Sequence, residues 1–286
     1  MTEPVALGMP KRLSHSQLTS YMSCSEQYRL VRRRGLPDSY SWALAGGSAF
    51  HSWTELYDRG IPLEPEAFVQ FLDEQVKSAL KDDRNTLFDE SDIKPTGRAS
   101  KDWPNKRDRA WWEHHGPIFA QKYIDWRASD NELLPPESKP DEDFLIEQSV
   151  EGTLGGIDVL GYIDRLVLDS PFGKPVIVDI KTGKEPGTSL QLATYAVLMS
   201  KKLGIPIQHG AFYLAEKGEL SSIIDLSKYT DAHIESMYDD ARRGIEAGVY
   251  IPNPNAFCST CPVKMYCRLY GNTPPEGVPL NEGPIE

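Results

Sequence analysis

The sequence predicts an α/β protein in which helices flank a mixed central sheet and a cysteine clasp joins the N- and C-terminal regions. Three observations predict this fold. Short apolar strands are confined to residues 144–214, with helical patterns on both sides. The strand at 176–180 is apolar almost throughout, which is typical of a strand buried on both faces. The chain has four cysteines, and they stand near its two ends.

The first half of the chain is expected to be mostly helical. Residues 14–24 begin with serines that suit a helix N-terminus, and residues 42–57 predict a second helix. A third helical region covers 64–127, interrupted by a polar loop at 82–105. Its apolar residues recur at i, i+3, i+4 and i+8, in Phe68, Phe71, Leu72 and Val76. This region predicts a helical insertion before the sheet.

The second half is expected to hold the sheet. A linker rich in Pro, Glu and Asp at 134–143 precedes strands predicted at 144–150, 157–168 and 176–180. The remaining predicted elements are a helix at 189–203, a strand at 210–214 and a helix at 231–247. We expect a single domain over residues 1–286. Its parts are the N-terminal helices (1–60), a helical lobe (61–140), a core (141–230) and a C-terminal helix with the cysteine cluster (231–286).

Composition narrows the class of protein. The chain has 286 residues, of which 40% are hydrophobic, and this is enough to bury a full core. No apolar run approaches the roughly 20 residues of a membrane span. The N-terminus lacks the charged start and apolar stretch of a secretory signal. We therefore expect a cytoplasmic protein without a membrane partner.

Charge is unevenly distributed along the chain. The net charge of -11 argues against a protein that coats DNA without specificity. One local stretch is nevertheless basic and contains Arg29, Arg32, Arg33 and Arg34. A second contains Lys94, Arg98, Lys101, Lys106, Arg107 and Arg109, interleaved with Trp103, Trp111 and Trp112. Such stretches suit phosphate contacts and base stacking. The second stretch is equally compatible with solvated helix faces and core tryptophans.

The cysteine spacing predicts a metal site. Cys258, Cys261 and Cys267 have the spacings C-x2-C and C-x5-C, which let three thiolates converge on one centre, and Cys24 can complete a four-sulfur set. Zinc and a [4Fe-4S] cluster both accept four cysteines. A three-plus-one set that spans most of the chain is less usual for zinc, so the iron-sulfur interpretation is favoured and zinc stays the alternative. Disulfides are disfavoured because the expected compartment is reducing.

Carboxylates and an amine are expected to meet at the ends of two neighbouring strands. Asp164 lies in Gly-Tyr-Ile-Asp-Arg, and Asp179 and Lys181 lie in Val-Asp-Ile-Lys-Thr-Gly, on the two strands of one predicted hairpin. Residues i and i+2 of a strand point to the same face, so Asp179 and Lys181 project together while Ile180 turns into the core. Oxygen-rich sites of this kind suit Mg2+ or Mn2+. Taken alone, each motif is also explained by surface ion pairs beside a hairpin.

In order along the chain, these motifs resemble the RecB-type branch of the PD-(D/E)XK nucleases that carries an iron-sulfur clasp. That branch includes the AddB nuclease domain and the CRISPR-associated iron-sulfur exonucleases, many of them encoded by phages. The resembling segments are 16–28 and 251–267 with the cluster cysteines, 47–51 with the histidine, 161–164 and 179–181 with the acids, and 191–195 with a Q-x3-Y motif. The third-motif acid is Asp179 where many relatives have glutamate, and the second motif lacks the proline that names the superfamily. Residues 64–143 match no motif.

The resemblance implies a restriction-endonuclease-like core and a metal-dependent DNA exonuclease. One or two Mg2+ or Mn2+ ions would be bound by His51, Asp164, Asp179 and the Ile180 carbonyl. Lys181 would position the attacking water, and Gln191 and Tyr195 would contact DNA or brace that lysine. Apart from the resemblance, the local basic charge makes Arg32, Arg33 and Arg34 candidates for DNA contacts. Glu147 is a weaker candidate for the metal pocket. A [4Fe-4S] cluster on the four cysteines would be structural.

Plainer interpretations accompany these assignments. In isolation, His51 fits a hydrogen-bonded core histidine, and Gln191 with Tyr195 fits a packing pair on one helix face. A second functional hypothesis is a catalytically inactive DNA-binding module with a metal clasp, which the complete set of site residues disfavours. The expected substrates are DNA ends or single strands in recombination, repair or phage DNA processing. No G-x4-G-K-[ST] sequence is present, so helicase activity would come from a partner.

Overall fold

The structure is a computed structural model that describes residues 9–36, 38–82, 87–129, 133–134, 140 and 144–270. Its backbone divides into two compact units. The core unit consists of Ser39–Val150 and Tyr162–Lys228. The end unit consists of Met1–Asp38, Glu151–Gly161 and Tyr229–Glu286. The division cuts across the four predicted parts, because the helical lobe and the sheet share the core unit while the two chain ends share the other.

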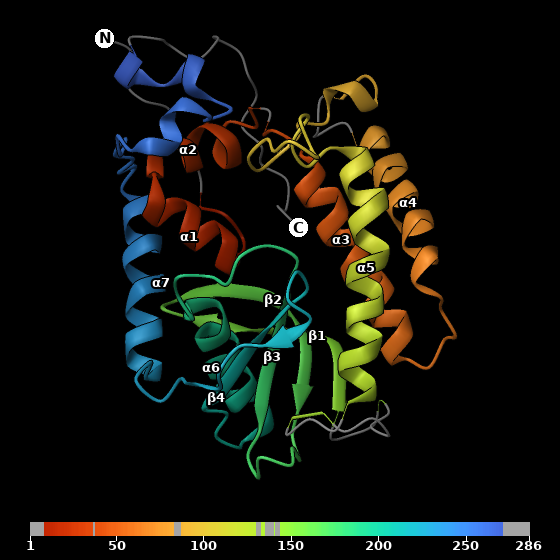
Figure 1. Cartoon of the computed structure of the whole chain (residues 1–286). Coiled ribbons are helices and arrows are strands. Elements are labelled where there is room, and N and C mark those ends of the chain that lie inside the picture. The colour runs from red at the N-terminus through yellow and green to blue at the C-terminus, as the bar shows by residue number, and fades with distance from the viewer. Residues whose placement is uncertain are drawn as a thin grey trace. The chain divides into compact units, whose positions relative to one another are not determined.

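Three helices of the core unit pack against one another, as Figure 1 shows: α3 (Trp42–Asp58), α4 (Phe68–Lys81) and α5 (Arg109–Ala128). Each of the predicted helices in this region is confirmed within a few residues. The α5 helix begins where the Asp108 side chain accepts a hydrogen bond from the Trp111 amide at 3.0 Å. The predicted apolar stripe on α4 faces the core, with Phe68, Leu72 and Val76 buried and Phe71 partly buried.

A glycine allows α3 and α5 to approach closely. A Cβ atom on Gly46 would lie 2.1 Å from the indole ring of Trp112, a distance that no side chain can occupy. Trp112 is 1% exposed and belongs to the main hydrophobic core. A contact of this kind needs glycine on the helix that receives the ring.

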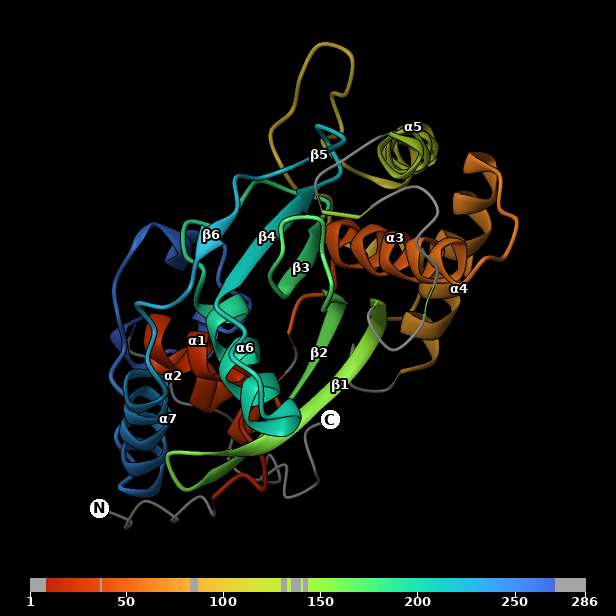
Figure 2. The ribbon, with the colours of Figure 1, turned by 90° about the horizontal axis from the view of Figure 1, so that it is seen from below.

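The sheet has the strand order β1-β2-β3-β4-β5, with β6 paired to β4 (Figure 2). Its strands are β1 (Phe144–Leu154), β2 (Ile157–Val167), β3 (Val176–Lys181), β4 (His209–Leu214), β5 (Glu219–Leu220) and β6 (Ile224–Asp225). The β2 and β3 strands are antiparallel with Arg165 opposite Val178, and β3 and β4 are parallel with Asp179 opposite Phe212. Helix α6 (Leu190–Leu203) connects β3 to β4 and packs on both. The predicted mixed sheet and its hairpin are therefore confirmed.

The end unit contains α1 (His15–Ser23), α2 (Ser25–Tyr28), a π-helical turn (Arg29–Arg33) and α7 (Asp231–Glu246). The predicted capped start of α1 is confirmed, because the Ser14 side chain accepts from the Gln17 amide at 3.3 Å. The C-terminal segment returns to α1, where Tyr21 Oη donates to the Val249 carbonyl at 2.7 Å. The β1–β2 turn also lies in this unit and passes so close to α7 that only glycine fits at Gly155.

Some elements differ from the prediction. The β1 strand runs four residues beyond the predicted end, because the turn falls at Gly155 and Gly156, whose φ values of 56° and 77° suit a two-residue hairpin. The two-residue strands β5 and β6 were not predicted, since they are too short for a periodic signal. Most of the predicted linker at 134–143 falls outside the described residues. Among the described helices, none is long and apolar enough to cross a membrane.

Candidate active site

A compact ligand group lies in the core unit and consists of His51 on α3, Glu147 on β1 and Asp164 on β2. One ligand atom from each residue lies within 4.8 Å of the others. In the part of the chain that the structure describes, this is the one set of three or more His, Cys, Asp or Glu residues with that spacing. His51 Nδ1 lies 3.4 Å from Asp164 Oδ1, and the two side chains are 33% and 11% exposed. The group is therefore mostly shielded but reachable from solvent.

Asp164 is also tied to the next strand. Its Oδ2 accepts a hydrogen bond from the Ile180 amide at 2.6 Å. Ile180 itself is 1% exposed, as the strand alternation predicts. One oxygen of Asp164 is thus occupied by β3, and the other faces His51.

Asp179 and Lys181 project to the same side of β3 and contact each other. Lys181 Nζ lies 2.7 Å from Asp179 Oδ2 and donates to Gln191 Oε1 at 3.2 Å. Gln191 in turn forms a side-chain hydrogen bond with Tyr195, one helical turn further along α6. Lys181, Gln191 and Tyr195 are therefore linked by hydrogen bonds in that order.

Negative charge is crowded in this pocket. Burial, followed by the charge of Asp164, raises the pKa of Glu147 to about 7 and that of Asp179 to about 6. Burial also acts to raise the pKa of Asp164, but His51 and the Ile180 amide outweigh it and lower this pKa overall. Burial lowers the pKa of His51, but Asp164 and the other acids raise it overall. A bound cation would relieve this repulsion.

The donor set fits a hard divalent cation. Its carboxylate oxygens suit Mg2+ or Mn2+. Asp179 Oδ2 is buried and accepts no hydrogen bond of regular geometry from the described residues, despite its ion pair with Lys181. The compact ligand group contains Glu147, which the sequence ranked as a weaker candidate, and does not contain the predicted ligand Asp179.

Two residues near the site were not identified from the sequence. Arg165 follows Asp164 and resembles a surface charge in the sequence, yet it is 1% exposed. Its Nε donates to Asp58 Oδ2 at 2.7 Å. The sequence carries one weak signal for this contact, because Asp58 stands two helical turns after His51 and therefore lies on the same side of α3.

The four cysteines line one cavity in the end unit. Each is partly buried and none is in a disulfide. Burial raises the pKa of the Cys261 thiol, and the other three cysteines act in the same direction. The predicted approach of Cys24 to the C-terminal three is therefore present. Beside the cavity, Leu30, Leu36 and Val263 form a small hydrophobic cluster on which Cys261 packs.

The two basic stretches differ in exposure. Arg33 is only 7% exposed and hydrogen-bonds Tyr250, whereas Arg32 and Arg34 are partly exposed. In the second stretch Trp111 and Trp112 are buried, as core tryptophans would be. The exposed cations there are Lys94, Arg98, Lys101 and Lys106.

Comparison with known proteins gives one family and a few relatives. Residues 12–268 match the family described as the PD-(D/E)XK nuclease superfamily. The Gene 69 protein of Mycobacterium phage D29 is 26% identical over 92% of this chain and 98% of its own length. The Gene 69 protein of Mycobacterium phage L5 is 27% identical over 94% of this chain and 100% of its own length. A crystal structure of a candidate exonuclease from Eubacterium rectale aligns with a TM-score of 0.44 and 14% identity, over 88% of this chain and 87% of that one.

Proposed function

Because this chain belongs to the PD-(D/E)XK nuclease superfamily, we propose that it is a divalent-metal-dependent DNA exonuclease that hydrolyses phosphodiester bonds. The observation that carries the proposal is the convergence of His51, Asp164 and Lys181 from one helix and two strands. The exonuclease mode and the DNA substrate are inferred from the order of the motifs. Two relatives come from phages, which favours phage DNA processing or recombination as the setting.

One or two Mg2+ or Mn2+ ions would be held by His51, Asp164, Asp179 and the Ile180 carbonyl. Glu147 would be a further ligand, since it belongs to the compact ligand group. A bound cation supplies Lewis-acid activation of the phosphodiester and of the attacking water. The raised pKa values of Glu147 and Asp179 mean that these side chains must lose protons before they can act as ligands.

Lys181 would position the water and stabilise the charge that develops on the phosphate. Its Nζ is held between Asp179 and Gln191, so the ammonium group has little freedom. A fixed positive charge is more effective against a developing negative charge than a mobile one, because it needs no reorganisation during the reaction. Gln191 and Tyr195 would therefore act on catalysis through Lys181.

A basic loop at 94–107 would guide the DNA backbone. It is attached to the helix of His51, since the Trp42 amide donates to the Lys94 carbonyl at 3.0 Å. Its other end is attached beside β4 by the ion pair between Arg107 and Glu216 at 2.5 Å. The exposed cations of the loop are suited to phosphate contacts. In the end unit, Arg32 and Arg34 are further candidates.

The four cysteines would hold a structural [4Fe-4S] cluster. They line one cavity. A three-plus-one set of cysteines that spans most of the chain is less usual for zinc, which favours the cluster over a single zinc ion.

The test compares Asp179→Asn and Lys181→Met with the wild type on end-labelled linear DNA and on closed circular single strands, with Mn2+ or EDTA. We expect Mn2+-dependent trimming of the linear DNA by the wild type, and a loss of at least 100-fold in both variants. Asp169→Asn, at an exposed position in the loop after β2, is the matched control and should retain full activity. Cleavage by Asp179→Asn at the wild-type rate would exclude this active site, and cutting of the circles would exclude an exclusively exonucleolytic mode. DNA binding without any cleavage would favour the inactive binding module.

A further inference from the structure

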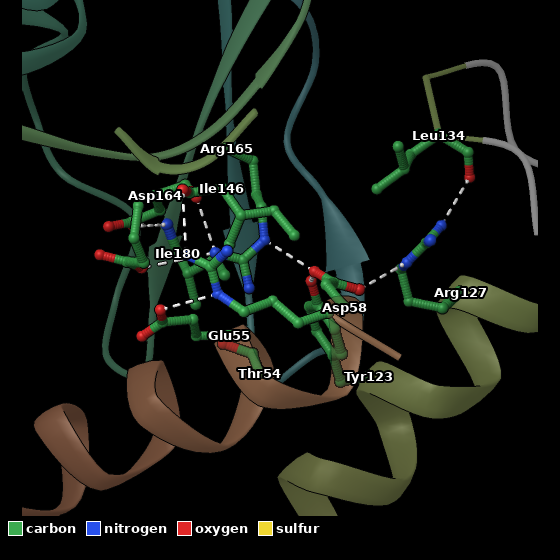
Figure 3. A network of polar contacts seen from close by, with 12 residues as sticks. Thr54, Glu55, Asp58, Tyr123, Arg127, Leu134, Ile146, Asp164, Arg165 and Ile180 are labelled. Atoms are coloured by element: carbon green, nitrogen blue, oxygen red, sulfur yellow. Dashed lines mark hydrogen bonds and ion pairs between the residues drawn. The ribbon is translucent and has the colours of Figure 1, made fainter. Parts of the chain in front are cut away.

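A buried ionic network adjoins the compact ligand group, and its centre is Asp58, the last residue of α3 (Figure 3). The Asp58 side chain is 0% exposed. Its Oδ1 accepts from Arg127 Nε at 2.9 Å, and its Oδ2 accepts from Arg165 Nε at 2.7 Å and Tyr123 Oη at 2.5 Å. Asp58 therefore joins α3 to both α5 and β2.

The two arginines of the network, Arg127 and Arg165, contact different parts of the chain. Arg127 Nη1 donates to the Leu134 carbonyl at 3.2 Å, in the segment after α5. Arg165 Nη1 instead donates to the Asp164 carbonyl at 2.7 Å and lies 3.4 Å from Glu147 Oε1. Figure 3 shows Asp58 between these two arms. The Arg165 arm thus contacts two residues of the compact ligand group.

Asp164 and Glu147 are both held by contacts with residues outside the compact ligand group. Asp164 is fixed at its carbonyl by Arg165 and at its Oδ2 by the Ile180 amide. Glu147 has a φ of 48°, a left-handed backbone conformation that is unfavourable for a non-glycine residue. Such a conformation persists where neighbouring contacts hold it. Its ion pair with Arg165 is one contact that does so.

The network also influences the position of His51, the third residue of the compact ligand group. His51 and Asp58 lie two turns apart on the same side of α3. The Asp58–Arg165 contact therefore sets the position of α3, which carries His51, against β2, which carries Asp164. A change in that contact would alter the distance between the imidazole and the carboxylate.

Stability alone is a weak explanation for this network. Burial of ions is unfavourable, and well-packed apolar replacements are often as stable as a buried ion pair. An apolar side chain at 165 could not hold Asp58, the Asp164 carbonyl and the Glu147 carboxylate together. A planar guanidinium has the donors to do so.

We propose that Arg165, held by Asp58, is a positioning residue that sets the spacing of the compact ligand group for a divalent cation. This inference rests on the proposed metal-dependent activity, and it concerns metal affinity rather than the chemical step. Groups that orient metal ligands commonly change metal affinity by 10–100-fold when they are replaced.

The experiment measures Mn2+ binding to the full chain by calorimetry at pH 7.5 without DNA. Arg165→Lys keeps the charge but cannot span the three partners, and we expect it to weaken Mn2+ binding at least tenfold. Arg127→Lys changes the other arm of the same Asp58 and is the matched control, with Mn2+ affinity within twofold of the wild type. Cleavage by Arg165→Lys should recover toward the wild-type rate at saturating Mn2+. If Arg165→Lys does not fold, Asp58→Asn takes its place. It should show the same loss of Mn2+ affinity and the same recovery of cleavage at saturating Mn2+.

Equal losses of Mn2+ affinity in Arg165→Lys and Arg127→Lys would mean that the network is merely structural and would overturn the proposal. Unchanged affinity in Arg165→Lys would overturn it as well, as would a wild type that binds no Mn2+. A wild type that binds Mn2+ but cuts no DNA would contradict the proposed nuclease function. The affinity comparison among the variants would still decide the role of Arg165 in that case.

Discussion

At the scale of single residues, folding disfavours the ionised forms of two acids of the site, Glu147 and Asp179. Glu147 and Asp179 have ordinary pKa values of 4.5 and 3.8 and are raised to about 7 and about 6 in the folded chain. Between about pH 4 and pH 7 the folded state therefore holds protons that the unfolded state has released. Stability falls as pH rises through such a window. His51, whose pKa is also raised, acts in the same direction.

We predict that the protein in EDTA has a lower Tm at pH 7.5 than at pH 5.5, and that Mn2+ raises the Tm more at pH 7.5. Calorimetric scans at the two pH values measure both effects. Glu147→Gln is the matched variant, because it removes one charge and keeps the shape. It should be more stable than the wild type at pH 7.5 in EDTA and should depend less on pH. A Tm that rises with pH in the wild type would contradict the prediction.

The residues of the site could be predicted from the sequence where chemistry and spacing are local. Asp179 and Lys181 are two positions apart on one strand, so alternation alone brings them together. Arg165 could not be predicted, because its partner Asp58 is 107 positions away. In a sequence, a buried arginine looks the same as an exposed one until the carboxylate that pairs with it is known.

At the scale of elements, the helices and strands with strong periodicity were predictable and the close contacts between them were not. The α4 stripe and the apolar β3 strand follow from side-chain pattern alone. The approach of α3 to α5 depends on which ring meets which glycine, and neither Gly46 nor Trp112 reveals this in isolation. Likewise, the sequence left open whether Trp111 and Trp112 lie in the core or on a surface that stacks with bases. Both belong to the main hydrophobic core.

Gly46→Ala tests this contact between helices. The added methyl group would lie 2.1 Å from the Trp112 ring, so we predict a loss of about 1–3 kcal/mol in the free energy of unfolding. Gly47→Ala is the control, because its methyl group would meet only Thr182 Oγ1 at 3.4 Å. That variant should gain up to about 1 kcal/mol from helix propensity. Urea denaturation measures the free energy of unfolding of both variants. Equal changes in Gly46→Ala and Gly47→Ala would show that the Trp112 ring is not tightly held.

At the scale of the whole molecule, the cysteine set joins segments from the two ends of the chain. We predict that Cys24→Ser loses the iron and the visible absorption of the wild type and unfolds at a lower temperature. A cross-link that closes a loop of well over 100 residues is worth about 5 kcal/mol in the chain-entropy model. Iron and sulfide analysis with thermal scans provides the measurement.

The control for this prediction is Ser23→Ala, an exposed neighbour of Cys24, which should keep iron and stability. Zinc in place of iron in the wild type would contradict the proposed [4Fe-4S] cluster. It would agree with a metal that joins the four cysteines. Full iron content in Cys24→Ser would remove Cys24 from the ligand set.

The discontinuous end unit has a consequence for the timing of synthesis. Residues 9–36 leave the ribosome well before their partners on α7 and around Cys258. At roughly 5–20 residues per second, Cys24 waits on the order of tens of seconds for the other three cysteines. The core unit can fold during that interval, but the end unit cannot. The proposed cluster would therefore be inserted late in biogenesis, and a nascent chain that stops before Cys258 would expose Cys24 on an incomplete unit.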